Sequence, residues 1–243
     1  MSSGAGERLD GVDAPDRQQG TLAYWGPAIA VSLSMFIAVI DSTLMNVAIP
    51  AIVSDLDTTV SVVQGAIAVY SLVMAALMLP GGKLPSIYGV RRLMQGTLVV
   101  YAAGSLLAAV SWSPAVLYFG WSLVEGAAAA VLMPLTFTVL IVTYDGKDRA
   151  RALGVLAGVS AAGAAVGPIF GGALTTFASW RWGFALEAVV VAVALVFVRY
   201  VSAAPLTSDP DPLDVGGTVL SAVGATSLVV GFLLAGKFGW LVA

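Results

Sequence analysis

Long apolar runs alternate with short polar stretches along almost the whole chain. A helix needs about 20 predominantly apolar residues to cross the hydrocarbon core of a bilayer. Lipid cannot hydrogen-bond to backbone N–H and C=O groups, and the runs are far longer than the strands of a membrane β-barrel. The pattern therefore predicts an all-α, polytopic transmembrane helical bundle with spans at about 27–48, 60–80, 93–111, 115–142, 151–176, 183–202 and 215–236.

The basic residues gather on one side of these spans, which predicts the orientation. Nine Lys and Arg residues lie in the N-terminal segment and in the connections after the second, fourth and sixth spans, whereas the other connections hold only Arg181. Because Lys and Arg concentrate in cytoplasmic loops, the N-terminus is predicted to be cytoplasmic, in the plasma membrane. Trp25 is then expected at the inner interface, and Trp112, Trp180 and Trp182 at the outer one.

The composition excludes several kinds of chemistry. Hydrophobic residues make up 59% of the 243 residues and charged residues 10%, compared with about 25% charged residues in a soluble domain. The chain has no Cys and no His, so disulfides, Cys/His metal sites, thiol nucleophiles and histidine proton relays are excluded. With no nucleophile motif or ligand cluster either, we predict no enzyme, no metal and no cofactor. A net charge of −3 gives no reason to expect a nucleic-acid partner.

Polar segments divide the chain into four parts. Residues 1–26 are Gly-rich and polar and are predicted to be a cytoplasmic tail, followed by one six-helix bundle over 27–202. A linker with several Pro and Asp residues covers 203–214, and 215–243 contains the seventh span. Because no polar tail follows that span, the pattern indicates a truncated or split protein.

Acidic residues inside the spans are the candidates for chemistry. A charged side chain at the bilayer centre costs about 2.5–3.5 kcal/mol, so such residues usually face a bundle interior or a wet cavity. Glu125 lies about ten residues into its span, about 15 Å deep, where it could carry a proton or instead bond to a neighbouring helix. Asp41, with Asn46 nearby, could couple transport to protons or hold a hydrogen-bond network between helices. Glu187 is a third coupling candidate, unless it reaches the outer interface or Arg181.

The fifth span combines small residues with a proline. Small side chains at four-residue spacing let helix backbones approach closely in lipid, and a proline inside a helix bends it. The pattern predicts either a conformational pivot between two states of the bundle or tight static packing. The residues concerned are Gly163, Gly167, Pro168, Gly171 and Gly172.

Three motifs resemble those of one family. The pattern Gly-x-x-x-Gly-Pro-x-x-Gly-Gly over 163–172 resembles the helix-five signature of drug/proton antiporters in the major facilitator superfamily. The segment from Asp41 to Pro50 is similar to the helix-one motif of the fourteen-helix branch, and Ser179 to Phe184 to its helix-six entry. The resemblance implies two six-helix bundles with two helices between them, of which this chain would hold the N-terminal half and one further helix.

The chain departs from the family pattern at two places. The loop after helix two, a cytoplasmic gate in the family, keeps several positions but has Ser86 where an acid is usual. Helix four has Ser122 in place of the Arg associated with proton coupling, and Glu125 in place of a Gln. One hypothesis is that Glu125 carries the proton directly. The predicted gate residues are Gly82, Lys83, Gly89, Arg91 and Arg92.

Two functions from different classes follow. The first is a proton-linked secondary transporter that exports hydrophobic or cationic organic solutes or drugs, with membrane lipid around it. Alternating access needs a second bundle, which could be a separate chain, a second copy or a missing C-terminal part. The alternative is a non-transporting membrane subunit that kept the packing motifs and lost the coupling charges.

Overall fold

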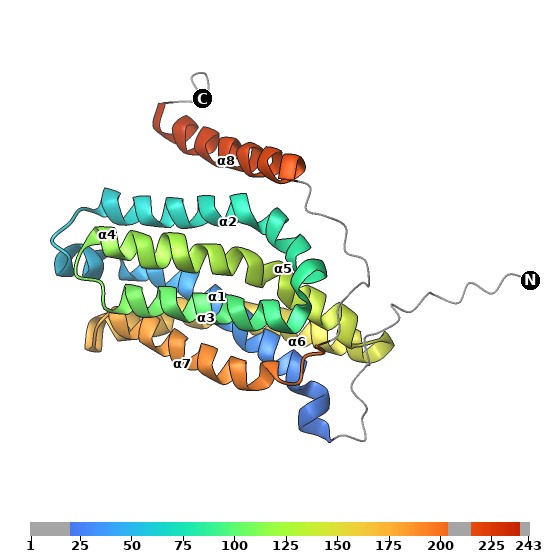
Figure 1. The fold of residues 1–243 in the computed structure, drawn as a ribbon. Helices are drawn as coiled ribbons and strands as arrows, with labels where there is room; N and C mark the ends of the chain where they lie inside the picture. Colours follow the sequence, from blue (N-terminus) through green and yellow to red (C-terminus); the bar gives the residue numbers. More distant parts are fainter. Residues whose placement is uncertain (1–19, 204–214, 239–243) are drawn as a thin grey trace, which may run out of the picture.

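The computed structural model describes residues 20–203 and 215–238, and all of its regular structure is helical (Figure 1). Most of the predicted tail, nearly all of the predicted linker and the last five residues lie outside the described residues. In the described part, α4, η2 and α5 follow one another without a break, so seven rods result, as predicted. The helices are α1 (Thr21–Asp55), α2 (Val60–Tyr88), α3 (Val90–Ala109), α4 (Pro114–Leu117), the π-helix η2 (Tyr118–Glu125), α5 (Gly126–Thr143), α6 (Gly146–Phe177), α7 (Arg181–Val198) and α8 (Val215–Phe238).

Five of these rods are long and apolar enough to cross a membrane: α1, α2, the continuous α4–η2–α5 rod, α6 and α7. The predicted third span, α3, begins with Arg91 and Arg92 and has 20 residues, so its apolar part is shorter. The all-α, multi-pass architecture predicted from the apolar runs is confirmed.

Two predicted boundaries are wrong because helical structure continues beyond the apolar runs. Helix α1 starts at Thr21, six residues before the predicted span. Helix α2 continues to Tyr88 and contains Pro80 and Pro85, and its end bends towards the start of α3 (Figure 1). Lys83 therefore lies on a helix, and the connection between α2 and α3 is reduced to Gly89, whose φ of 76° suits a glycine.

Helix α1 lies at the centre of the bundle. It packs on α6 and α7, while α3 packs on α7 and η2, and α2 packs on α5 and α8 (Figure 1). Much of the apolar part of α1 is buried, whereas α2 and α6 are each buried along a narrow stripe. Both peripheral helices therefore present wide apolar faces that suit lipid or another apolar partner.

The glycines of α6 face α1. A Cβ atom added to Gly163 would lie 3.3 Å from Val39, one on Gly171 would lie 3.2 Å from the Leu44 Cα, and one on Gly167 would overlap Thr43. Gly172 is looser, with its nearest neighbour 3.8 Å away, and Pro168 is exposed. The glycine stripe thus allows α6 to pack closely on α1, which is compatible with both predicted roles, a pivot and static packing.

The three tryptophans that were expected at the outer interface differ in their exposure. Trp112 and Trp182 are exposed, whereas Trp180 is buried among protein side chains. The reason is a polar cluster: Asp55 accepts a hydrogen bond from Trp180 Nε1 at 3.2 Å and pairs with Arg181. This cluster ties the end of α1 to the start of α7.

Candidate functional site: a buried cluster of three carboxyl groups

The three acids predicted inside the spans meet at one place. One carboxylate oxygen each from Asp41, Glu125 and Glu187 lies within 4.8 Å of the other two. Asp41 and Glu125 are completely buried and Glu187 is 3% exposed. Helices α1, η2 and α7, far apart in the sequence, thus direct their acidic side chains to a common point.

Close contact between the backbones of α3 and η2 supports the cluster. A Cβ atom added to Gly104 would lie 2.7 Å from the Glu125 Cβ and 2.8 Å from the Gly120 carbonyl oxygen, and one on Gly120 would lie 3.0 Å from the Ala108 nitrogen. Glycine at both positions lets α3 and η2 approach as small residues do in membrane bundles. The contact occurs within a π-helix, an irregularity frequent at functional sites.

Neighbouring polar groups contact one oxygen of each acid. Ser105 Oγ lies 2.8 Å from Glu125 Oε2 and 3.2 Å from Glu187 Oε2. Trp121 Nε1 donates to Asp41 Oδ1 at 2.8 Å, and its ring stacks on Tyr70 with centroids 4.8 Å apart. The cluster is therefore held by side chains from α2, α3 and η2 as well as by its own helices.

The other oxygen of each acid is unsatisfied. Asp41 Oδ2, Glu125 Oε1 and Glu187 Oε1 are buried without a hydrogen-bond partner, and the same is true of the Tyr101 hydroxyl. No Lys or Arg of the described residues forms an ion pair with the cluster. The cluster thus has three carboxyl groups in an apolar interior without a nearby positive charge. Their oxygen atoms can accept protons or coordinate a small cation.

The structure separates Asn46 from the three acids and excludes one of the alternatives for Glu187. Asn46 lies outside the cluster, because its side chain is exposed and donates to the Ser42 carbonyl at 2.7 Å. Glu187 reaches neither the outer interface nor Arg181, which pairs with Asp55 instead. Sequence reasoning missed Ser105 and Trp121, although each is a hydrogen-bonding side chain within an apolar run.

The predicted gate residues lie at the α2–α3 junction. Gly82, Lys83 and Arg92 are exposed, and Arg91 is half-buried. Ser86, at the position where the family has an acid, donates to the Lys83 carbonyl at 2.7 Å. The junction therefore presents basic charge without a compensating acid among its described neighbours.

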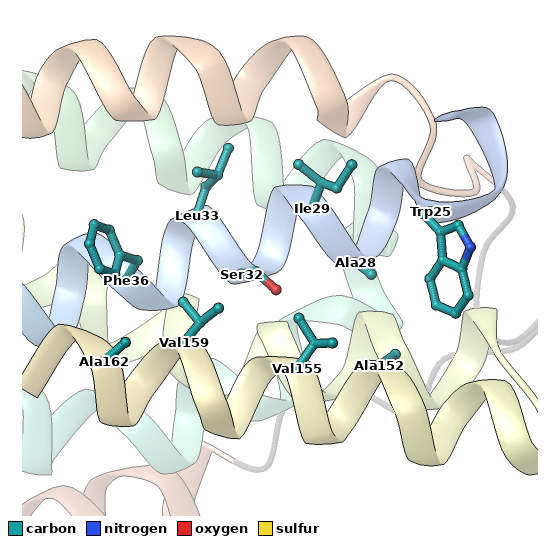
Figure 2. A pocket seen from close by; sticks show the side chains of 10 residues that line it. All are labelled: Trp25, Ala28, Ile29, Ser32, Leu33, Phe36, Ala152, Val155, Val159 and Ala162. Carbon is teal, nitrogen blue, oxygen red and sulfur yellow. The ribbon is translucent and has the colours of Figure 1, made fainter. Parts of the chain in front are cut away.

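A groove between α1 and α6 is a second candidate feature (Figure 2). It has a volume of about 470 Å³, with Trp25 towards one end and Phe36 towards the other. Ser32 points between the two helices, and its hydroxyl is buried without a hydrogen-bond partner. The remaining lining is apolar: Ala28, Ile29, Leu33, Ala152, Val155, Val159 and Ala162.

A bundle of membrane-length helices with buried acids is the architecture of secondary membrane transporters. The model of the Major Facilitator Superfamily matches residues 31–243, and the chain belongs to this superfamily. The family that the three motifs indicated is confirmed.

The relatives include antibiotic resistance and export proteins. The chain is 31% identical to the puromycin resistance protein pur8 of Streptomyces alboniger over 218 residues, covering 89% of this chain and 43% of the relative. It is 34% identical to the cephamycin export protein CmcT of Amycolatopsis lactamdurans over 213 residues, covering 84% and 43%. The tetracenomycin C resistance and export protein of Streptomyces glaucescens is 30% identical, covering 89% and 40%. The chain thus spans less than half the length of these relatives.

Solved transporters share the fold. The crystal structure of the peptide transporter POT in complex with sulfate superposes with a TM-score of 0.67 at 17% identity, covering 93% of this chain and 51% of that one. The bundle therefore corresponds in fold to about half of a complete transporter.

Proposed function

We propose that this chain forms the N-terminal bundle of a proton-linked exporter of hydrophobic or cationic organic solutes. The buried cluster of Asp41, Glu125 and Glu187 carries the proposal. The printed names of the relatives, which concern puromycin, cephamycin and tetracenomycin C, support small organic molecules as the substrate class.

The spacing of the three acids favours shared protons. Two negative charges no more than 4.8 Å apart repel each other by about 3.5 kcal/mol or more at an effective dielectric constant of about 20. A serine hydroxyl has one proton to donate, so Ser105 can donate to one glutamate, and contact with the second is favourable when that acid is protonated and donates back to Ser105 Oγ. The cluster is thus most stable when protons neutralise at least two of its members.

Movement of the helices would couple these protons to transport. The acids come from α1, η2 and α7, so a relative shift of these helices changes the spacing of the acids and admits water. Proton release then accompanies one state of the bundle and proton uptake the other, which is the requirement for coupling.

The groove between α1 and α6 is the proposed surface for the organic solute. Its walls are apolar, with an aromatic ring towards either end and one unpaired hydroxyl at Ser32. Such a lining favours apolar solutes with few polar groups. Alternating access requires a second bundle facing this one, supplied by another chain, a second copy or a further part of the protein.

Transport in vesicles tests the proposal. The full chain is reconstituted alone and together with the C-terminal bundle of one of the relatives, and efflux of a fluorescent organic cation is recorded under an imposed pH gradient. Gradient-dependent efflux is expected with both bundles, and Glu125→Gln should abolish its dependence on pH. Asp57→Asn is the matched control, because Asp57 lies in an exposed turn with a φ of 46° that asparagine tolerates.

The alternative of a non-transporting subunit rests on the two serines that replace family charges. Ser122 donates to the Ala66 carbonyl and Ser86 to the Lys83 carbonyl, so both side chains are satisfied locally. Absence of efflux from both preparations, with folded protein in the vesicles, would favour this alternative and contradict the transporter proposal.

A further inference from the structure

A second groove lies at the junction of α2 and α3, away from the carboxyl cluster. It has a volume of about 560 Å³ and is bounded by the end of α2, the first half of α3 and the start of α5. Its walls include Ile87, Leu93 and Val131. Gly96 leaves its floor open, because a Cβ atom added there would meet no atom within 4 Å.

Unpaired positive charge lies at one end of this groove. Arg92 lines the groove, is exposed and has no ion-pair partner among the described residues. It belongs to the first turn of α3, which has no side-chain cap on Gly89 and no acidic residue. Free N–H groups and the helix dipole add to the attraction for an anion at this position.

The side chain of a mostly buried threonine lies further along α3 in the same groove. Thr97 is 7% exposed and lines the groove, and its hydroxyl, which is not itself fully enclosed, has no hydrogen-bond partner among the described residues. Thr97 follows Arg92 by five positions, about 7.5 Å along the helix axis. The groove therefore offers a cation, then a hydrogen-bonding group, and beyond it the apolar side chain of Val100.

We propose that this groove binds an anionic phospholipid of the cytoplasmic leaflet. Its phosphate would bind Arg92 and the first turn of α3, the glycerol esters would lie near Gly96 and Thr97, and one acyl chain would continue along Val100. The order of groups along the groove matches their order in a phospholipid. The leaflet follows from the predicted orientation, in which the basic connections are cytoplasmic.

The charge of the headgroup determines which class of phospholipid the groove prefers. A zwitterionic headgroup would bring an ammonium group close to Arg91 and Arg92, which disfavours it, whereas an anionic headgroup gains from both arginines. Helix α8 contacts α2 near Lys83, in a separate depression with Leu79 and Pro80. The groove is thus left accessible to lipid from the side of α3 and α5.

Native mass spectrometry of the purified full-length chain tests the proposal. The protein is exchanged into detergent with equal amounts of phosphatidylglycerol and phosphatidylcholine that carry the same acyl chains. The wild type is expected to retain phosphatidylglycerol preferentially. Arg92→Gln should lower the ratio of the two retained lipids about fivefold, the effect of one arginine near a membrane surface.

Two further variants separate headgroup binding from acyl-chain binding. Gly96→Leu fills the floor without displacing an atom near its Cβ position and should reduce retention of both lipids. Lys147→Gln is the matched control, since it removes an exposed charge from another predicted cytoplasmic connection, and it should leave the ratio unchanged. Any one of three results would overturn the proposal, provided that circular dichroism shows folded protein. These are equal retention of both lipids by the wild type, an unchanged lipid ratio in Arg92→Gln, and a fall of the ratio in Lys147→Gln as large as in Arg92→Gln.

Discussion

The hydroxyl of Tyr144 is inserted into the first turns of α1, between Ala28 and Tyr24. It accepts a hydrogen bond from the Ala28 N–H at 3.3 Å and donates to the Tyr24 carbonyl at 2.7 Å. Those two backbone groups would otherwise bond to each other, and insertion of a side chain at this point bends a helix, as Pro27 does. Burial raises the pKa of Tyr144 to about 12, so the hydroxyl keeps the proton that it donates at physiological pH.

Replacing Tyr144 with phenylalanine should therefore destabilise the bundle. The variant loses both hydrogen bonds of the hydroxyl, which the two backbone groups recover only in part by bonding to each other, and one net hydrogen bond contributes about 0.5–1.5 kcal/mol. We expect a lower unfolding temperature in detergent, measured by circular dichroism. Tyr88→Phe, at an exposed tyrosine, should change it little, and equal effects of both variants would contradict the inserted hydrogen bonds.

The contact between Gly104 and Glu125 gives a second prediction. Gly104→Ala forces α3 away from η2, because the added carbon would lie 2.7–2.8 Å from Glu125 and the Gly120 carbonyl. A loss of about 1–3 kcal/mol is expected for such overpacking. Gly96→Ala, on the same helix with open space around it, should be neutral or stabilising, and the pair is compared by thermal unfolding. Similar stability of the two variants would argue against the close contact.

The hydrogen bond from Trp121 to Asp41 gives a third prediction. Trp121→Phe keeps an aromatic ring next to Tyr70 but leaves Asp41 Oδ1 without its donor. We expect a loss of about 1–3 kcal/mol, measured by urea unfolding in mixed micelles. Trp112→Phe is the control, since Trp112 is 76% exposed. If removal of either tryptophan had the same effect, the bond would contribute nothing specific.

The contact between Gly167 and Thr43 gives a fourth prediction. Gly167→Ala would collide with the Thr43 side chain and should destabilise the α1–α6 pair. Thr43→Gly in the same protein should restore much of the loss, because it removes the colliding atoms. Gly158→Ala, which meets no neighbour, is the matched control. Thermal unfolding of Gly167→Ala, of Thr43→Gly alone and of the double variant gives the coupling, and additive effects of the two substitutions would count against the contact.

The sequence allowed prediction of the helices and of the acids, but not of how the acids meet. Long apolar runs determine helices in lipid, so the seven rods could be anticipated. Their ends could not, because Lys83 and Ser86 continue α2 beyond the apolar run. The meeting of Asp41 with Glu187 depends on the rotation of α1 and α7, which small differences in packing decide and which a single sequence does not reveal.

Three other side-chain positions could not be predicted for a similar reason. Asn46 and Asp41 lie on one helix five residues apart, and that spacing places Asn46 on a different face of α1, where it is exposed. The sequence did not reveal that the indole N–H of Trp180 donates to Asp55, at the far end of α1. Ser105 reaches Glu125 because the neighbouring Gly104 lets α3 approach η2 closely.

Infrared spectroscopy tests the central claim, that Asp41, Glu125 and Glu187 share protons inside the bundle. The full-length chain in lipid nanodiscs at neutral pH is expected to show the carbonyl band of protonated carboxylic acids. The band should decrease in Glu125→Gln and in Glu187→Gln, and remain unchanged in Asp57→Asn. Absence of the band from the wild type, or an undiminished band in both glutamine variants, would contradict the claim.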